Sequence, residues 1–270
     1  MSGEDGKAPK VEGAWPLAIA KTESKILKEG TGEKVDKNAT LKVNYVGVNG
    51  RTGKEFDSSY KRGTTADFPL AQVVPGFAKG LVGKHQGDRV LIMMPGSDGY
   101  DSQGGAPQAG IMKGDSLIFV VDIVAIPLPK ATGETVKPAA GLPTVKEVQG
   151  APAVTIGKAT KPNKLVVQPL IKGKGAAVTA HDSIDVKYRT YAWSSGELIE
   201  DGYSGEPVTG SMNSVIPGWK KGLIGQTVGS RVMLIVPPAD AYPNGSTNPP
   251  VKKGETLIYV IDILSAQKES

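Results

Sequence analysis

A phrase of nine residues occurs twice in this chain. The sequence VVPGFAKGL occupies residues 73–81 and VIPGWKKGL occupies residues 215–223, with six of the nine positions identical. The register extends far beyond this phrase, since KGDSLIFVVDIV at 113–124 matches KGETLIYVIDIL at 253–264. A repeat of about a hundred residues has the size of a whole domain, and this excludes a solenoid of short units. The chain is therefore predicted to contain two domains of the same fold.

The composition around the two copies indicates the domain boundaries. The first twenty residues are polar and predict a flexible tail at 1–20, followed by a first domain at 21–128. Residues 129–162 are rich in Pro, Lys, Ala, Gly and Thr, a composition that favours an extended, semi-rigid linker. The segment EVQGAPAVTI at 147–156 leaves open some local packing on a domain. The second domain is expected at 163–270.

The local patterns within each copy are mostly those of strands. In TLKVNYVGV (40–48) apolar and polar residues alternate, which suits a half-buried strand. The stretches DRVLIMM (88–94) and SLIFVVDIVAI (116–126) are rich in β-branched residues, as central strands are. The sequence NGRTGKEF (49–56) is typical of a hairpin turn. Pro75 predicts the start of one short helix of about two turns. The expected fold class is α+β, with antiparallel strands around one short helix.

Several function classes are excluded or disfavoured by composition. The chain has no cysteine and two histidines, so thiolate sites are excluded and a histidine metal cluster is not expected. We expect no cofactor and no metal. The net charge of +5 is scattered along the chain, whereas nucleic-acid binding needs a clustered basic surface. No apolar run is long enough to span a bilayer. We also expect a monomer.

The motifs of each copy, taken in order, resemble one known family. The first copy carries NYVG, GKEFDSS, VVPGF, GY and IMKGDSLIF. These are similar to motifs of the FKBP-type peptidyl-prolyl cis-trans isomerases, and the resemblance covers residues 21–126 and 163–266. It implies a twisted antiparallel sheet wrapped around a short helix. It also implies isomerisation of proline peptide bonds to assist protein folding, with proline-containing polypeptides as clients and macrolides as possible inhibitors.

The resemblance implies an apolar pocket in the first copy. Its wall and floor would consist of the aromatic residues Tyr45, Phe56, Phe77 and Phe119. Val73 and Val74 would form a rim, and Ile111 would close another edge. The family often has Trp at the position of Phe77 and an aromatic residue near Ala66. Both departures reduce the apolar surface, so a weaker affinity is expected at a site that survives.

Three polar groups are implied at the same pocket. The backbone N–H of Val74 would donate to the substrate carbonyl, and Tyr100 would present its hydroxyl from a loop over the pocket. Asp57 would lie at the wall, paired with Arg62. The glycine-rich loop GSDGYDSQGGAPQAG would be the mobile flap, on which substrate preference would depend.

The second copy retains most of the matching positions but has a different wall. Its segment GELIEDG replaces GKEFDSS, and its tip PNGSTNPPV is shorter. The implied second-site residues are Tyr188, Ile199, Glu200, Val215, Ile216, Trp219, Tyr242, Val251 and Tyr259. We therefore expect the first domain to be the better catalyst. The alternative is a chaperone or binding module with weak turnover, and a weaker one is a cell-surface interaction protein.

The resemblance also suggests a location. Tandem domains of this type on Lys/Pro/Thr-rich linkers look like bacterial cell-envelope proteins in which the polar tail follows a lipid-anchored cysteine. No such cysteine is present here. We expect an extracytoplasmic protein, with a cytoplasmic one as the alternative.

Overall fold

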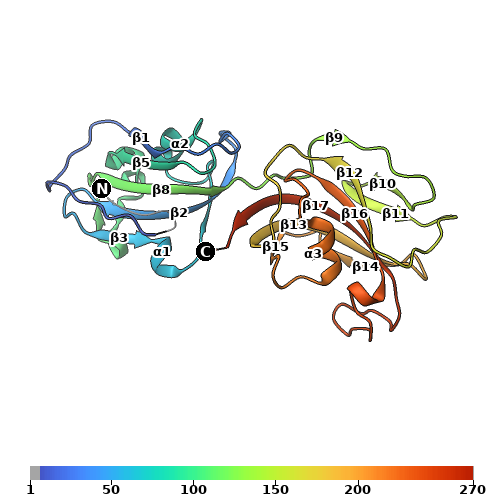
Figure 1. Ribbon diagram of the computed structural model, residues 1–270. Coiled ribbons are helices and arrows are strands. Elements are labelled where there is room, and N and C mark those ends of the chain that lie inside the picture. Colours follow the sequence, from blue (N-terminus) through green and yellow to red (C-terminus); the bar gives the residue numbers. More distant parts are fainter. Residues whose placement is uncertain (1–6, 270) are drawn as a thin grey trace. The chain divides into compact units, whose positions relative to one another are not determined.

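The fold was analysed in a computed structural model that describes residues 7–269 (Figure 1). The chain divides after Pro127 into two compact units. In residues 7–269, no helix has both the length and the apolar character needed to cross a membrane. Each unit is built around its own antiparallel sheet with few helices, so the predicted α+β class is confirmed.

The sheet of the first unit has six strands in the order β1-β5-β8-β2-β3, with β4 also paired to β2. These strands are β1 (Glu23–Lys28), β2 (Thr40–Asn49), β3 (Glu55–Ser58), β4 (Ala66–Pro69), β5 (Arg89–Met94) and β8 (Leu117–Ala125). The helices are α1 (Ser59–Arg62) and α2 (Pro75–Leu81). A two-stranded sheet of β6 (Gly105–Ala106) and β7 (Ile111–Met112) lies in the predicted flap.

The second unit repeats this plan with one sheet ordered β14-β13-β17-β16-β12-β9, and β15 also pairs with β13. The strands are β9 (Glu134–Thr135), β12 (Val166–Lys172), β13 (Asp182–Ala192), β14 (Leu198–Asp201), β15 (Val208–Ser211), β16 (Arg231–Val236) and β17 (Leu257–Lys268). One helix, α3 (Pro217–Leu223), matches α2. A separate hairpin consists of β10 (Thr144–Val148) and β11 (Ala151–Thr155).

The centre of each sheet is the strand that comes last in its unit. β8 lies between β5 and β2, and β17 lies between β16 and β13. Both strands are apolar and β-branched, and residues such as Val121 and Ile261 are completely buried. The sequence pattern of a central strand therefore matches the position that these segments occupy.

The short helix begins where the sequence predicted it. Pro75 and Pro217 stand at the first helical positions, where a missing backbone N–H has no cost. α2 packs against β5 and α3 packs against β16, and Leu81 and Leu223 are completely buried. The helix thus covers the inner face of the sheet, where the core clusters of both units lie.

The outer face of the first sheet is covered by the N-terminal segment. Trp15 and Leu17 pack against the buried residues of this face, among them Val48 and Ile118. The N–H of Leu17 donates to the Gly50 carbonyl at 2.8 Å, which fixes the segment on the β2–β3 turn. The prediction of a flexible tail over 1–20 is therefore wrong for its second half, because two apolar side chains anchor it; residues 1–6 lie outside the described residues.

The outer face of the second sheet is covered by the β10–β11 hairpin, which lies beside β12 and β16 in Figure 1. Val145 and Val154 pack on a cluster that includes Met233 and Ile258. The hydroxyl of Tyr191 donates to the Pro152 carbonyl at 3.0 Å. The extended linker predicted over 129–162 is thus corrected, because Val145 and Val154 hold a packed hairpin on the sheet. The local packing that remained open for 147–156 is present.

Candidate functional site

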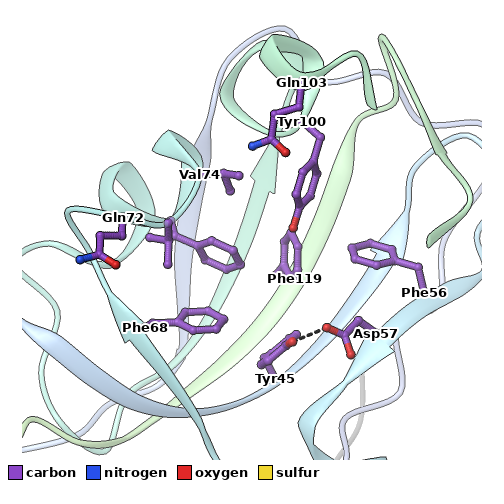
Figure 2. A pocket seen from close by; sticks show the side chains of 11 residues that line it. Tyr45, Phe56, Asp57, Phe68, Gln72, Val74, Tyr100, Gln103 and Phe119 are labelled. Carbon is purple, nitrogen blue, oxygen red and sulfur yellow. Dashed lines mark hydrogen bonds between the residues drawn. The ribbon is translucent and has the colours of Figure 1, made fainter. Parts of the chain in front are cut away.

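A cavity of about 260 Å³ opens on the inner side of the first sheet. It lies where β2, β3, β4, β8, the start of α2 and the flap meet, as Figure 2 shows. Eleven residues line it: Tyr45, Phe56, Asp57, Phe68, Gln72, Val73, Val74, Phe77, Tyr100, Gln103 and Phe119. Eight of these were predicted from the sequence, and the chain thus brings together side chains that are more than seventy residues apart.

The floor of the cavity is a continuous layer of aromatic rings. The ring of Phe77 lies with its centroid 4.6 Å from that of Phe119 and 4.7 Å from that of Phe68. Tyr45 completes the layer at 5.2 Å from Phe68. Tilted and edge-to-face contacts of this kind stabilise the layer beyond simple burial. The site therefore has a rigid apolar floor before any ligand arrives.

The wall formed by Phe56 depends on a glycine in the neighbouring strand. Phe56 meets Phe119 edge-on, with 5.5 Å between the ring centroids. A Cβ atom at Gly47 would lie 2.7 Å from the Phe56 ring and 2.8 Å from the Phe119 ring. Only glycine leaves room for both rings at this point in the sheet. The wall is therefore built by two positions, Phe56 and Gly47.

One side of the cavity is polar and carries a charged pair. The Tyr45 hydroxyl donates to the Asp57 carboxylate, and Arg62 forms the predicted ion pair with Asp57. The Arg62 guanidinium also donates to the Tyr45 oxygen at 3.1 Å and lies 5.5 Å from the centre of its ring. Burial, and after it the hydrogen bond to Asp57, raise the pKa of Tyr45 to about 12. Tyr45 therefore stays a neutral donor throughout the physiological pH range.

The rim offers donors to a substrate carbonyl. Val73 and Val74 lie just before α2, and within residues 7–269 no acceptor pairs with the Val74 N–H. Tyr100 extends from the flap toward the other lining residues in Figure 2. Its partial burial raises the pKa of Tyr100 above its usual value, with the Asp57 charge as a smaller cause. Both groups are thus available as hydrogen-bond donors facing the cavity.

Two predicted residues lie outside the cavity lining. Ile111 is buried in the core cluster behind the flap, because β7 turns its side chain inward. Arg62 reaches the site through Asp57 and Tyr45 and does not line the cavity itself. The predicted place of Ile111 at an edge of the pocket is therefore wrong, whereas the predicted pairing of Arg62 with Asp57 is present.

Three lining residues were missed by the sequence analysis. Phe68 supplies the aromatic ring that was sought near Ala66, two positions along the same face of β4. The period of two in a strand could have identified it. Gln72 and Gln103 are exposed amides at the mouth, and no pattern in the sequence marked them.

The second unit assembles its predicted aromatic residues in the same way. The ring of Trp219 stands nearly perpendicular to Tyr188 at 5.0 Å and to Tyr259 at 5.5 Å. The other predicted residues, except Glu200, pack on or within the same core cluster: Ile199, Val215, Ile216, Tyr242 and Val251. Trp219 and Tyr259 are buried, whereas Tyr188 and Tyr242 are partly exposed. The floor thus survives in the second copy.

The carboxylate of the second site has other partners. Glu200 accepts hydrogen bonds from the Tyr188 hydroxyl at 3.3 Å and from the Thr190 hydroxyl at 2.8 Å. Thr190 pairs with Glu200 across the strands as Gly47 pairs with Asp57. No ion pair to Glu200 forms anywhere in the part of the chain that the structure describes. The two sites therefore differ in charge as well as in shape.

Residues 7–269 contain no group of three or more His, Cys, Asp or Glu side chains arranged to hold a metal ion. The chemistry at the two sites is that of rings, hydroxyls, amides and carboxylates.

Curated proteins of bacteria are similar to parts of this chain. The probable FK506-binding protein of Corynebacterium glutamicum is 32% identical over 117 residues, which cover 43% of this chain and 98% of that protein. The FK506-binding protein of Streptomyces anulatus is 40% identical over 100 residues, or 36% of this chain and 80% of that protein. The isomerase FkpA of Escherichia coli is 36% identical over 107 residues, or 39% of this chain and 38% of that protein.

Solved structures also match. FkpA from Escherichia coli matches with a TM-score of 0.35 and 30% identity, and the match covers 38% of this chain and 48% of that one. The three FKBP domains of wheat FKBP73 match with a TM-score of 0.39 and 18% identity over 92% of this chain and 95% of that one.

The family comparison is decisive because it matches both copies. The family model of the FKBP-type peptidyl-prolyl cis-trans isomerases matches residues 31–124 and again residues 174–264, together more than half of the chain. These are the two units that carry the aromatic sites. The chain belongs to the FKBP-type peptidyl-prolyl cis-trans isomerase family.

Proposed function

We propose that the first unit isomerises Xaa-Pro peptide bonds of unfolded or partly folded polypeptides and thereby assists folding. The observation that carries this proposal is the cavity of about 260 Å³ with an aromatic floor and two donors at its rim, the Val74 N–H and the Tyr100 hydroxyl. Its size suits a proline ring with its adjoining peptide groups. The second unit is proposed to bind peptides with weak turnover.

The reaction needs no nucleophile, which agrees with a site that has no cysteine or histidine. Rotation about a peptide bond crosses a barrier of roughly 18–20 kcal/mol because it breaks amide resonance. The twisted amide has less charge separation than the planar one, so a dry apolar cavity lowers the cost of the twist relative to water. The aromatic floor would hold the proline ring. The bond then rotates while the rest of the peptide stays bound.

The donors would act mainly in the twisted state. The Val74 N–H and the Tyr100 hydroxyl would hold the substrate carbonyl in its rotated position, and interactions that strengthen in the transition state accelerate the reaction. Tyr45 and Asp57 would fix the polar wall, and Arg62 would keep Asp57 in place. Each of these groups would act without changing its charge.

The different roles proposed for the two units are argued from the wall that Phe56 forms in the first unit and Ile199 in the second. In the second unit Ile199 stands at the position of Phe56, and Thr190 occupies the space that Gly47 leaves open. An aliphatic wall with a buried hydroxyl has a less apolar surface for the proline ring. We infer that this site retains affinity for a peptide but stabilises the twisted amide less.

A protease-free exchange assay by NMR on the full chain tests the proposal. Phe56→Ala is expected to lower kcat/KM for a blocked Xaa-Pro tetrapeptide by at least about tenfold, or about 1.4 kcal/mol of transition-state stabilisation. Ile199→Ala in the second unit is expected to change the rate by less than about twofold. Leu27→Ala, at an exposed position of β1, serves as the control.

An unchanged rate in Phe56→Ala would show that the first cavity is not the catalytic site. A large loss in Ile199→Ala would instead move the activity to the second unit. The chaperone alternative is examined separately, by refolding of a protein limited by proline isomerisation. Assistance that persists after the Phe56→Ala change would favour chaperone action over catalysis.

A further inference from the structure

The first site contains its own cation. Arg62 lies over the ring of Tyr45, with 5.5 Å between the guanidinium carbon and the ring centre. It also forms an ion pair with Asp57. A guanidinium group over an aromatic face and beside a carboxylate is attracted by both. The pair of Tyr45 and Asp57 is therefore a cation-binding arrangement that the first unit fills from its own chain.

The second site keeps the ring and the acid but has lost the cation. Tyr188 and Glu200 occupy the positions of Tyr45 and Asp57, and they share a hydrogen bond of 3.3 Å. The sequence from 190 to 219 contains no lysine or arginine at all. Arg189, just before this stretch, is engaged by Asp201 at 2.7 Å. No basic side chain of the described chain thus takes the place of Arg62.

The hydroxyl groups around Glu200 orient its carboxylate without neutralising it. Thr190 and Tyr188 both donate to it, at 2.8 Å and 3.3 Å. Hydrogen bonds from neutral donors leave the negative charge in place. The charge also acts on Tyr242, the counterpart of Tyr100, since burial first and the Glu200 charge second raise the pKa of Tyr242 above its usual value. The second site therefore has a fixed, partly buried negative charge beside its aromatic rings.

The rings around this charge suit a cation. Trp219 stands nearly perpendicular to both Tyr188 and Tyr259, with interplanar angles of 87° and 89°. Perpendicular rings present faces in different directions, and tryptophan is the aromatic residue that attracts cations best. In the first site the ring at this position is Phe77, which attracts a cation less strongly. Trp219 at the position of Phe77 thus favours a bound cation, and so does the loss of Arg62.

We propose that the second site binds extended peptides through an arginine side chain, which occupies the place that Arg62 fills in the first site. The guanidinium lies against the Tyr188 ring and pairs with Glu200. This inference rests on the proposed role of the second unit as a binding site, but it does not require turnover there. Arginine is favoured over lysine because its flat, weakly hydrated group stacks on rings and pairs with carboxylates.

The test uses the full chain labelled with ¹⁵N and the indole N–H signal of Trp219. That signal is one of three indole signals and is assigned by its loss in Trp219→Phe. The probes are the blocked peptides Ala-Arg-Pro-Phe, Ala-Leu-Pro-Phe and Ala-Glu-Pro-Phe. The arginine peptide is expected to bind about tenfold more tightly than the leucine peptide. This advantage should shrink at high salt because part of it is electrostatic.

Glu200→Gln is the decisive variant, since it keeps the shape of the side chain and removes the charge. It is expected to abolish the advantage of the arginine peptide and to leave the affinity for the leucine peptide unchanged. Glu206→Gln, at an exposed position of the β14–β15 loop, changes the net charge equally and should retain the full advantage. An unperturbed NMR spectrum of each variant shows that it is folded.

Two results would overturn the inference. One is equal affinity of the arginine and leucine peptides for the unmodified chain; the other is an arginine advantage that survives Glu200→Gln. Both concern binding at Trp219 only, so they leave the catalytic role of the first unit untouched. The failure of that role would instead appear as an unchanged isomerisation rate in Phe56→Ala.

Discussion

The two aromatic sites are built on the same strands and helix of the repeated fold, but their large side chains stand at different positions. In the first unit, Phe68 and Phe77 lie side by side, with 4.7 Å between the ring centroids. Phe68 pairs with Leu41 across the strands of the first unit, and Gly210 pairs with Ile184 in the second. Gly210 is therefore the counterpart of Phe68. Trp219 replaces Phe77 there. A larger ring on the helix thus accompanies the loss of a ring on the strand.

A second paired exchange lies at the wall of the site, where Gly47 and Phe56 are replaced by Thr190 and Ile199. Gly47 leaves space for the Phe56 ring in the first unit, whereas Thr190 fills that space in the second, where Ile199 is smaller than Phe56. Each exchange involves two positions that contact each other in the first unit. The comparison teaches that a duplicated site can change its chemistry through substitutions that occur in pairs.

The largest expected loss of stability comes from changing one member of the pair Phe68 and Phe77. Phe68→Gly should destabilise the first unit by about 4 kcal/mol, because it removes a buried ring and adds a flexible residue to a strand. Phe77→Trp in the same chain should restore about 1–2 kcal/mol. Native-state hydrogen exchange of the Val121 and Ile261 amides reports the stability of the two units separately. Simple additivity of the two changes would contradict the pairing.

Breaking the second pair should have a smaller effect on stability. Gly47→Thr is expected to cost about 1–3 kcal/mol because its side chain overlaps the rings of Phe56 and Phe119. Adding Phe56→Ile should recover most of this cost, as measured by the same exchange experiment. Isomerase activity should stay low in the double variant, since its wall is then that of the second unit. A fully active double variant would show that the wall does not explain the difference.

The turn after β2 differs less between the two units, and the difference can be tested by the pH dependence of stability. Asp115 accepts hydrogen bonds from Arg51 at 2.7 Å and from Asn49 at 2.8 Å, and these hold the pKa of Asp115 at about 2. In the second unit Glu255, at the matching position, accepts a hydrogen bond from the Ser194 N–H at 3.1 Å, and within the described residues no arginine pairs with it. The pKa of Asp115 is lower in the folded state than in the unfolded state. Its contribution is therefore complete above about pH 4 and is lost as the pH falls toward 2.

Arg51→Gln should weaken this acid dependence. The expected loss of stability at neutral pH is small, since Arg51 is exposed and solvent screens the pair. The difference from the unmodified chain should vanish near pH 2. Hydrogen exchange or chemical denaturation of the first unit at pH 2 and pH 6 provides the measurement, and a difference independent of pH would argue against the ion pair as its cause.

Much of the fold could be predicted because its signals are local. Alternation predicted β2, β-branched runs predicted β5 and β8, and Pro75 predicted the start of α2. The covering segments could not be predicted in this way. Trp15 and Leu17 stand singly in a polar segment, and their partners lie on strands that come later in the chain. Composition predicts a loose segment here, although the packing of two partly buried side chains holds it on the sheet.

The site was predicted largely by resemblance, and its errors have physical causes. Phe68 was missed because the search was centred on Ala66, whereas a strand repeats its face every second residue. Ile111 was placed at the pocket edge, but the flap turns it into the core. The link between Gly47 and Phe56 could not be read from the sequence, because it depends on the register of two strands.

The order of the strands has a consequence for synthesis on the ribosome. The middle strand of each sheet, β8 or β17, is the last one to be made. Until it emerges, β5 and β2 in the first unit, or β16 and β13 in the second, have no strand between them to pair with. Each unit should therefore remain open to chaperones for almost its entire translation and close in one late step. A chain that stalls before residue 117 would present unpaired edges of this kind, which are prone to aggregate.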